Sequence, residues 1–422
     1  MSAFRADAPF SPVYHRRTVF SWALYDFANS IYPAVMTTAV FPIFYSGYVV
    51  GDLAGEGGGD AWWGLAVSTS ALLIALSAPL LGAVADGAGV RKRLMAIFVG
   101  ICLVGVLAMT TLSPGMIVAG FCFFVIANVG YEGSLIFYNA YLPEIAPVER
   151  RGFVSGLGFG VGYLGSALGL VLVLPFAQDR TELVWPIVAA FFLLFSIPTF
   201  RNLPADRAGG IGIGRAAVGG IVRLRKTIAL VRRLPNLRRF LISYFFYIDG
   251  ILTLIVMAGV IAVETFGFNQ VQTIELFLIV QFSALVGSFA LARPTDRFGP
   301  KPVLRFVLIW WIGIGVAGYF VQSSALFYGL AVAGGLGLGS AQAASRTLMA
   351  SLIPKGKEAE MFGFYALCGK TSSVLGPALF GWLTVQFAGN QRPGFLLLTG
   401  FFLVGGFLLR FVKDPRVEAV GV

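Results

Sequence analysis

Long apolar runs alternate with short polar stretches along most of the chain. Runs of about 17 residues or more have the length that an α-helix needs to cross the core of a bilayer. The pattern predicts twelve spanning helices, at residues 18–47, 61–84, 92–112, 115–142, 151–177, 184–200, 239–265, 271–292, 302–321, 324–352, 359–388 and 393–412. We therefore expect an all-α, multi-pass membrane protein whose spans are separated by turns rich in Gly, Pro and Asn.

One connection is much longer than the others and divides the predicted helices six and six. It covers residues 201–238, so we expect an N-terminal six-helix bundle over 1–200 and a C-terminal one over 239–422. The halves also repeat. A constant shift along the chain places identical residues of the first half on the second, among them Pro143, Gly152 and Gly165 on Pro354, Gly363 and Gly376. A six-helix unit used twice is typical of transporters with two parallel halves.

The long connection carries an apolar stripe at helical spacing. Ile221, Leu224, Ile228 and Val231 form the stripe, and the neighbouring arginines and lysine lie off it. Such a pattern predicts an amphipathic helix in the membrane surface. We expect this linker to tether the two bundles.

The chain has 31 Lys and Arg against 20 Asp and Glu, a net charge of +11. Nearly all the basic residues lie in the termini and in alternate connections, whereas the opposite connections hold Arg180 and Arg392. By the positive-inside rule both termini are cytoplasmic. The basic excess therefore indicates topology and contact with anionic lipid headgroups, not a nucleic-acid partner. We expect a monomer in the cell (inner or plasma) membrane.

The remaining composition argues against an enzyme. Of all residues 57% are hydrophobic and 12% charged, and His15 is the single histidine. The three cysteines, Cys102, Cys122 and Cys368, each fall inside an apolar run. The sequence offers no set of metal ligands, no nucleophile with a base and no phosphate-binding loop, so we predict no metal and no cofactor. Without a sizeable domain outside the membrane, a receptor is also disfavoured.

Five ionisable side chains lie well inside the predicted spans. Asp26, Glu132 and Asp249 are acidic, and Arg346 and Lys370 are basic. An aspartate at the centre of a spanning helix costs about 2.5–3.5 kcal/mol on insertion scales, so such residues face protein or water. Each of the five is a candidate for substrate binding or coupling.

Two interpretations of these charges stay open. In the functional one, Arg346 and Lys370 bind a substrate carboxylate, while Asp26 and Glu132 bind an amine or carry a coupled proton. In the structural one, ion pairs hold the two halves together. Lys370 and Asp249 could pair with each other, and Arg346 could extend to the cytoplasmic headgroups.

Polar side chains on the predicted spans are candidate hydrogen-bonding partners of a solute. Asn29 follows Asp26 by three residues and so shares its helix face. Tyr25, Asn128, Gln281 and Gln342 lie within other parts of the predicted spans. Each can equally be a satisfied polar group of the core.

Two predicted cytoplasmic loops share one pattern, an acid at the end of a span followed by a glycine turn and cations. An acid there can pair with basic groups or with the N-terminus of a neighbouring helix, and so stabilise one conformation. We therefore predict a cytoplasmic gate whose residues are Asp86 and Arg91 in the first loop and Asp296 and Arg297 in the second.

These loops resemble the Gly-x-x-x-Asp-Arg-x-Gly-Arg-Arg signature of the major facilitator superfamily. The second loop keeps Asp-Arg-x-Gly from Asp296 to Gly299, whereas the first has Gly87 where Arg is usual. A narrower resemblance is to the Atg22-like, or UMF1, branch. It covers nearly the whole chain and is carried by four strings, at 22–30, 137–147, 151–165 and 342–377.

The resemblance implies a twelve-helix facilitator fold in two pseudo-symmetric bundles. In that architecture spans 1, 4, 7 and 10 line a central cavity, which implies that Asp26, Glu132, Asp249 and Arg346 lie on cavity helices. Fungal relatives in this branch are associated with amino-acid efflux from the vacuole.

Pattern, charge and resemblance together predict a secondary transporter that works by alternating access. The expected solute is small, polar and partly anionic, with amino acids or related metabolites first, and proton coupling is a hypothesis resting on Asp26 and Glu132. The alternative within transport is an exporter of amphipathic or lipid-like compounds.

Overall fold

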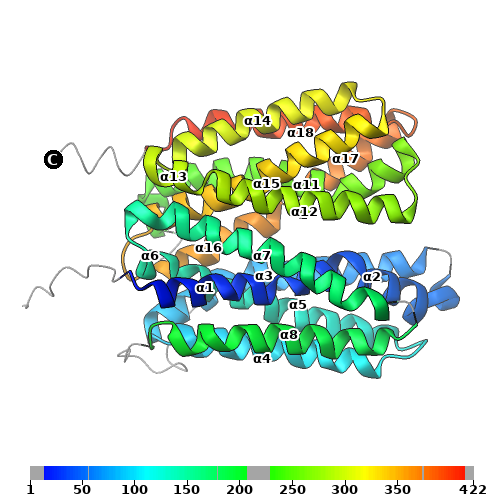
Figure 1. Ribbon diagram of the computed structural model, residues 1–422, viewed down its shortest axis with the longest axis horizontal. Coiled ribbons are helices and arrows are strands. Elements are labelled where there is room, and N and C mark those ends of the chain that lie inside the picture. The colour runs from blue at the N-terminus through cyan, green and yellow to red at the C-terminus, as the bar shows by residue number, and fades with distance from the viewer. Residues whose placement is uncertain (1–13, 56, 178, 207–228, 373–374, 414–422) are drawn as a thin grey trace, which may run out of the picture.

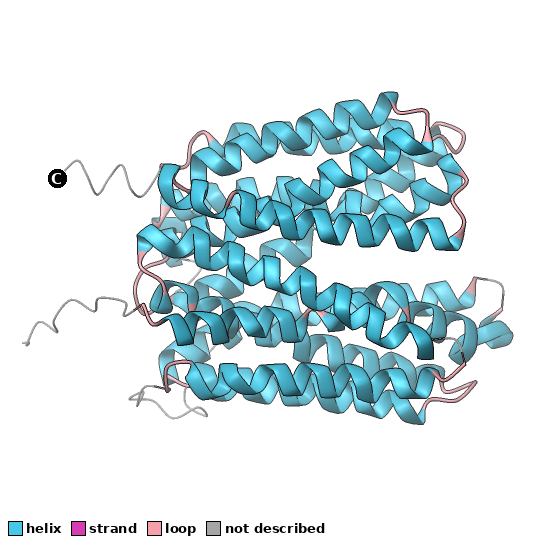
Figure 2. Cartoon of the chain, viewed as in Figure 1, coloured by secondary structure: helices cyan, strands magenta, loops and turns pink. Residues whose placement is uncertain are grey.

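The computed structural model describes residues 14–55, 57–177, 179–206, 229–372 and 375–413. Helices and the loops between them make up this described part, and it contains no β-strand (Figure 2). The predicted all-α fold is therefore confirmed. Residues 221, 224 and 228 of the predicted linker stripe lie outside the described residues, so the amphipathic helix stays a prediction.

The first group of helices runs from residue 16 to residue 202. Its first span begins as α1 (Arg16–Asn29). It continues through four short helical segments, the π-helix η1 (Pro33–Ala39), α2 (Phe41–Ile43), the π-helix η2 (Phe44–Val50) and the 3-10 helix η3 (Gly51–Ala54). The remaining elements are α3 (Gly58–Ala88), α4 (Arg91–Ala108), η4 (Met109–Thr111), α5 (Ile117–Ala140), α6 (Leu142–Ile145), η5 (Val148–Arg150), α7 (Arg151–Val173), η6 (Leu174–Phe176) and α8 (Thr181–Asn202).

The second group runs from residue 235 to residue 409. Its elements are α11 (Pro235–Phe266), α12 (Gln270–Ala290), α13 (Ala292–Phe298), α14 (Pro300–Phe320), α15 (Ser324–Leu352), α16 (Glu358–Ser372), α17 (Leu375–Gln386) and α18 (Arg392–Leu409). Within the described residues, eleven helical segments are long and apolar enough to cross a membrane. The predicted span 359–388 corresponds to α16 and α17, which are described as two shorter helices, so the count of twelve stays a prediction.

The two groups lie side by side with their helices roughly parallel to one long direction (Figure 1). Helices α11 to α18 fill the upper part of the view and α1 to α8 the lower part, with α7 and α16 along the contact. The short connections between α3 and α4, α13 and α14, and α15 and α16 lie at one end of the molecule, on the left. We call this the basic end; the positive-inside rule predicts that it is cytoplasmic.

Glycines allow the groups to approach closely near the basic end. On α7, a Cβ atom at Gly152 or Gly156 would lie within 3 Å of Thr295 or Ala292 in the other group. On α3, the backbone of α16 at Ala359 occupies the space where a side chain at Gly82 would lie. Four-residue glycine spacing predicts such contacts, because helices without side chains on one face pack backbone to backbone.

Candidate functional site

The first interior ion pair joins the two groups. Arg346 of α15 donates through Nη1 to Asp26 Oδ2 of α1 at 3.0 Å, and Arg346 is only 2% exposed. Its other nitrogens donate to Ser155 of α7, Nε to the hydroxyl oxygen at 2.9 Å and Nη2 to the carbonyl oxygen at 2.7 Å. Nη1 also donates to Asn139 Oδ1 at 3.3 Å. The guanidinium therefore makes four hydrogen bonds, and all four acceptors belong to the first group.

Aromatic rings surround the same guanidinium. Its carbon lies 4.0 Å from the ring centroid of Phe159 and 4.7 Å from that of Trp22. A Cβ atom at Gly158 would lie 2.5 Å from Asp26 Oδ2 and 2.7 Å from Arg346 Nη2, so a glycine is needed there. The interpretation in which Arg346 extends to the headgroups is wrong, because its side chain turns inward and finds a carboxylate and cation–π partners.

The second interior ion pair also joins the two groups, but it is more open. Lys370 Nζ of α16 lies 2.5 Å from Glu132 Oε1 of α5. The Lys370 side chain is 32% exposed and the Glu132 side chain 16%. The alternative in which Lys370 pairs with Asp249 is therefore wrong, since Glu132 is the carboxylate within reach. Both pairs match an acid of the first group with a base of the second.

Asp249 on α11 has a different environment. Its Oδ1 accepts from the backbone N–H of Gly376, on α17, at 3.0 Å and from the Thr253 hydroxyl at 3.4 Å. The residue is 1% exposed. Of these three acids, two face cationic partners, and Asp249 accepts from a backbone N–H and a hydroxyl.

Three predicted polar liners are satisfied inside the first group. Tyr25 donates to Ser134 Oγ at 2.6 Å, Asn29 donates to the Tyr25 carbonyl oxygen at 2.8 Å, and Asn128 donates to Ser70 Oγ at 2.8 Å. The Tyr25 and Asn128 bonds hold α1, α3 and α5 together, and the Asn29 bond lies within α1. The structure therefore gives all three a packing role that needs no solute.

The other two predicted liners lie on the second group. Gln342 Oε1 of α15 accepts from the Tyr163 hydroxyl of α7 at 2.6 Å, so it adds a further polar contact between the groups. Gln281 of α12 is half-buried. Sequence reasoning missed Ser155 and Tyr163 as partners across the groups. Both are polar residues of the glycine-rich α7, and a polar residue on a helix that packs closely was the available sequence signal for a contact across the groups.

The first predicted gate loop contacts the start of α16. Asp86, at the end of α3, accepts from the backbone N–H groups of Ala359 at 3.2 Å and Glu360 at 2.8 Å. Arg91 forms ion pairs with Asp86 at 2.7 Å, with Glu144 at 3.3 Å and with Glu358. A carboxylate at a helix N-terminus satisfies free N–H groups and complements the helix dipole.

The second gate loop repeats this arrangement in the opposite direction. Asp296 of α13 accepts from the N–H groups of Gly152 at 2.7 Å and Phe153 at 2.9 Å, at the start of α7. Arg297 is exposed, with its guanidinium 5.2 Å from the Phe298 ring centroid. Each group thus supplies an acid that caps a helix of the other, and both caps lie at the basic end.

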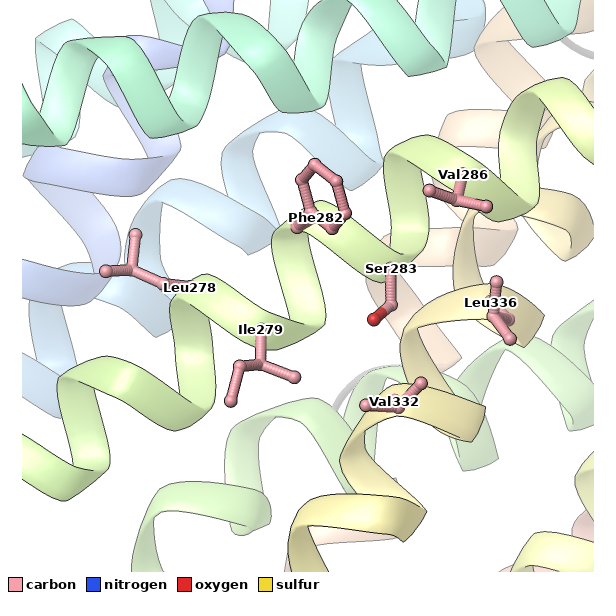
Figure 3. Close-up of a pocket in the computed structure, with 7 residues that line it drawn as sticks. All are labelled: Leu278, Ile279, Phe282, Ser283, Val286, Val332 and Leu336. Atoms are coloured by element: carbon pink, nitrogen blue, oxygen red, sulfur yellow. The ribbon is translucent and has the colours of Figure 1, made fainter.

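A groove of about 520 Å³ lies on α12 and α15, away from the charged pairs. Six of its seven lining residues are apolar, with Ser283 the exception (Figure 3). The others are Leu278, Ile279, Phe282, Val286, Val332 and Leu336. This surface suits a hydrocarbon chain and offers nothing to an anionic solute.

Comparison with known proteins places the chain in a family. A family model described as "Vacuole effluxer Atg22 like" matches residues 64–150 and 146–419. The chain belongs to this Atg22-like family. The resemblance stated from sequence is thereby confirmed. The interior ion pairs and the helix caps described above are therefore features of a member of the Atg22-like family.

Two relatives illustrate the breadth of the Atg22-like family. The chain is 31% identical over 408 residues to a Bacillus subtilis (strain 168) protein named as an uncharacterized MFS-type transporter, YxiO, covering 93% of this chain and 94% of the relative. It is 26% identical over 435 residues to autophagy-related protein 22 of Coccidioides immitis (strain RS), covering 82% and 70% respectively.

Solved structures confirm the major facilitator fold. The human organic anion transporter MFSD10 (TETRAN) superposes with a TM-score of 0.79 at 18% identity, covering 93% of this chain and 99% of that one. The transporter FucP in its outward conformation superposes with a TM-score of 0.68 at 15% identity, covering 94% and 98%. At such identities the likeness shows the fold and does not identify the solute.

Proposed function

We propose that this protein is a secondary transporter that moves a small, polar, partly anionic solute across the membrane by alternating access. Amino acids and related metabolites are the first candidates. The observation that supports this most is the ion pair between Glu132 and Lys370. It joins the two groups inside the spans, and the exposed part of each side chain remains within reach of a solute.

A zwitterionic solute can take the place of each partner in this pair. Its carboxylate accepts from Lys370, and its ammonium group donates to Glu132. Neither side chain is then left as a buried charge without a partner, which would cost several kcal/mol. Binding would at the same time break one contact between the groups, and this links occupancy of the site to their relative movement.

The contacts at the basic end would act as the gate. Asp86 and Asp296 each hold a helix of the other group, and the pair of Asp26 with Arg346 closes the same region from inside. All three contacts must separate before a solute can leave at this end. An arrangement closed at one end, with a part-exposed charged pair further along, supports alternating access.

A ligand screen followed by substitution tests the proposal. The purified protein is heated with each of the common L-amino acids, and a ligand that binds the folded state raises the unfolding temperature. We expect Lys370→Ala to weaken binding of the amino acid that gives the largest rise by at least about 10-fold, since a charge-assisted contact is worth about 1.5–3 kcal/mol. Isothermal titration measures the affinity.

Lys357→Ala is the matched control, because Lys357 pairs with Glu360 at 2.6 Å but is 46% exposed near the basic end. Its affinity should equal that of the unsubstituted protein. If Lys370→Ala keeps full affinity and only lowers the unfolding temperature, the pair is structural and the proposal fails.

The apolar groove favours a second candidate, an exporter of amphipathic compounds (Figure 3). The same screen includes a lysophospholipid as the probe. Binding that survives Lys370→Ala but is lost in Val332→Trp, which fills the groove, would replace the polar-solute proposal with this one.

Proton coupling is part of the proposal, and the geometry bears on where the proton binds. A proton on Asp26 would leave the buried Arg346 without its carboxylate, and a proton on Glu132 would neutralise the carboxylate that Lys370 faces. Uncompensated buried charges are costly. Asp26 is therefore better suited to the gate, and Glu132 to the solute site, than to binding the coupled proton.

A further inference from the structure

Asp249 is a buried carboxylate of α11 that forms no ion pair with a cation among the described residues. Its Oδ2 atom is buried and has no hydrogen-bond partner within the described part of the chain. Its Oδ1 atom accepts from Gly376 and Thr253. Asp26 and Glu132, by contrast, each face a base. One oxygen of Asp249 is therefore held in place while the other stays available.

The local sequence is suited to holding this carboxyl group. Pro377 has no N–H, so the N–H of Gly376 is the donor that α17 presents at this point. A side chain at Gly376 would collide with Asp249 Oδ1 and with Thr253 Oγ1. The Gly376-Pro377 pair thus gives Asp249 both a donor and the space to reach it.

Charged groups on the surrounding helices have other partners or lie elsewhere. Helix α11 packs against α12, α15, α16, α17 and α18. Lys370 of α16 pairs with Glu132, Arg346 of α15 pairs with Asp26, and α17 carries no ionisable residue. The remaining titratable groups on these elements are Arg238, Arg239, Tyr244, Tyr247 and Glu264 on α11, Glu275 on α12, Tyr328 on α15, Glu358, Glu360, Tyr365 and Cys368 on α16, and Arg392 on α18.

The ligand that fits Oδ2 is a proton. One backbone N–H and one hydroxyl offset only part of the charge of a carboxylate. A metal ion needs several oxygen ligands, whereas here a backbone N–H and a hydroxyl already donate to Oδ1. A proton on Oδ2 neutralises the group and leaves Oδ1 free to accept the same two hydrogen bonds.

We propose that Asp249 is the proton-binding site of the transport cycle. Its Oδ2 takes one proton from water on one side of the membrane, forming the neutral carboxyl group, and returns that proton to water on the other side. This inference rests on the proposed transport function, but its test needs no solute, so the two can fail separately.

Infrared difference spectra of the purified full-length protein between alkaline and acidic buffer test the proposal. A protonated carboxyl group has a C=O stretching band that the carboxylate lacks, and a buried group with few hydrogen bonds absorbs above the surface carboxyls. We expect this high-frequency band to disappear in Asp249→Asn and to persist in Asp26→Asn and Glu132→Gln. Asparagine keeps an acceptor for Gly376, so the fold should survive.

A measurement on the unsubstituted protein removes any dependence on the folding of the variant. When all aspartates carry a ¹³C-labelled side-chain carboxyl, the band must shift, since an aspartate and not a glutamate produces it. Persistence of the band in Asp249→Asn would overturn the proposal. So would a band that responds to NaCl at constant pH, which would indicate a sodium site instead.

Discussion

Arg346 shows how one residue can be tied to both halves of the molecule. It belongs to α15, yet Asp26, Asn139 and Ser155, which accept its hydrogen bonds, belong to the other group. Such a buried cation is stable only while its acceptors stay in place. The residue therefore reports on the relative position of the two groups.

Asp26→Ala should destabilise the protein strongly, because it leaves the buried Arg346 without its carboxylate. Removing one partner of a buried ion pair costs about 3–5 kcal/mol, whereas replacing both by apolar residues is often nearly neutral. We expect Asp26→Ala combined with Arg346→Met to recover most of the loss. Denaturant unfolding of the purified variants measures the free energy.

Arg93→Ala provides the control for that experiment. Arg93 lies 3.9 Å from Asp206 and its side chain is 74% exposed, so its loss should change the unfolding free energy by less than about 1 kcal/mol. A double variant no more stable than Asp26→Ala alone would contradict the ion-pair account.

At the scale of elements, the cap contacts of Asp86 and Asp296 repeat between the halves. Each acid ends a helix in one group and accepts two N–H groups from the start of a helix in the other. A similar repeat occurs within each group: Lys92 donates to the Leu203 carbonyl oxygen and Lys301 to that of Arg410. The internal repeat seen in the sequence thus extends to contacts.

Asp86→Ala should shift the protein toward a state open at the basic end. Losing a helix cap costs about 0.5–2 kcal/mol, which corresponds to about a 2- to 30-fold change in the ratio of the two states. Spin labels on the exposed Arg93 and Lys355 of the two groups would report a larger population of long distances. Double electron–electron resonance gives the distance distribution.

Glu149→Ala is the control for this shift, since Glu149 is exposed near the same end and its side chain forms no hydrogen bond or ion pair across the groups among the described residues. Its distance distribution should match that of the unsubstituted protein. An unchanged distribution in Asp86→Ala would show that the cap does not decide the state.

The spans and the capping acids could be predicted from sequence because both depend on local patterns. Apolar length identifies a span, and an acid before a glycine turn identifies a cap. The partner of Lys370 could not be predicted, because Glu132 and Asp249 are equally acidic in the sequence and only packing decides which is near. The role of Ser155 was missed for the same reason, because nothing in the sequence around a serine in a glycine-rich helix identifies its hydrogen-bond partner.

At the scale of the whole molecule, the distribution of charge predicts orientation. Basic residues gather at the end where the caps lie, and by the positive-inside rule that end faces the cytoplasm. The state described here, with its contacts at the basic end, would then be closed toward the cytoplasm.

Reporter fusions test the orientation directly. A green fluorescent protein fused after Val422 should fluoresce, because both termini are predicted to be cytoplasmic, and alkaline phosphatase there should be inactive. The same two reporters fused after Asn269, between α11 and α12, should give the reverse result. Active phosphatase at the C-terminus would show the opposite orientation.

The two glycine faces of α7 have a consequence for how fast such a protein can change shape. One face, with Gly162 and Gly165, meets α1 of its own group, and the other, with Gly152 and Gly156, meets α12 and α13. Where these glycines lie, α7 has no side chains that interdigitate with the facing helix. The barrier to sliding one group over the other would then come from the hydrogen bonds that cross the second face, among them those of Asp296 and Arg346, more than from side-chain packing.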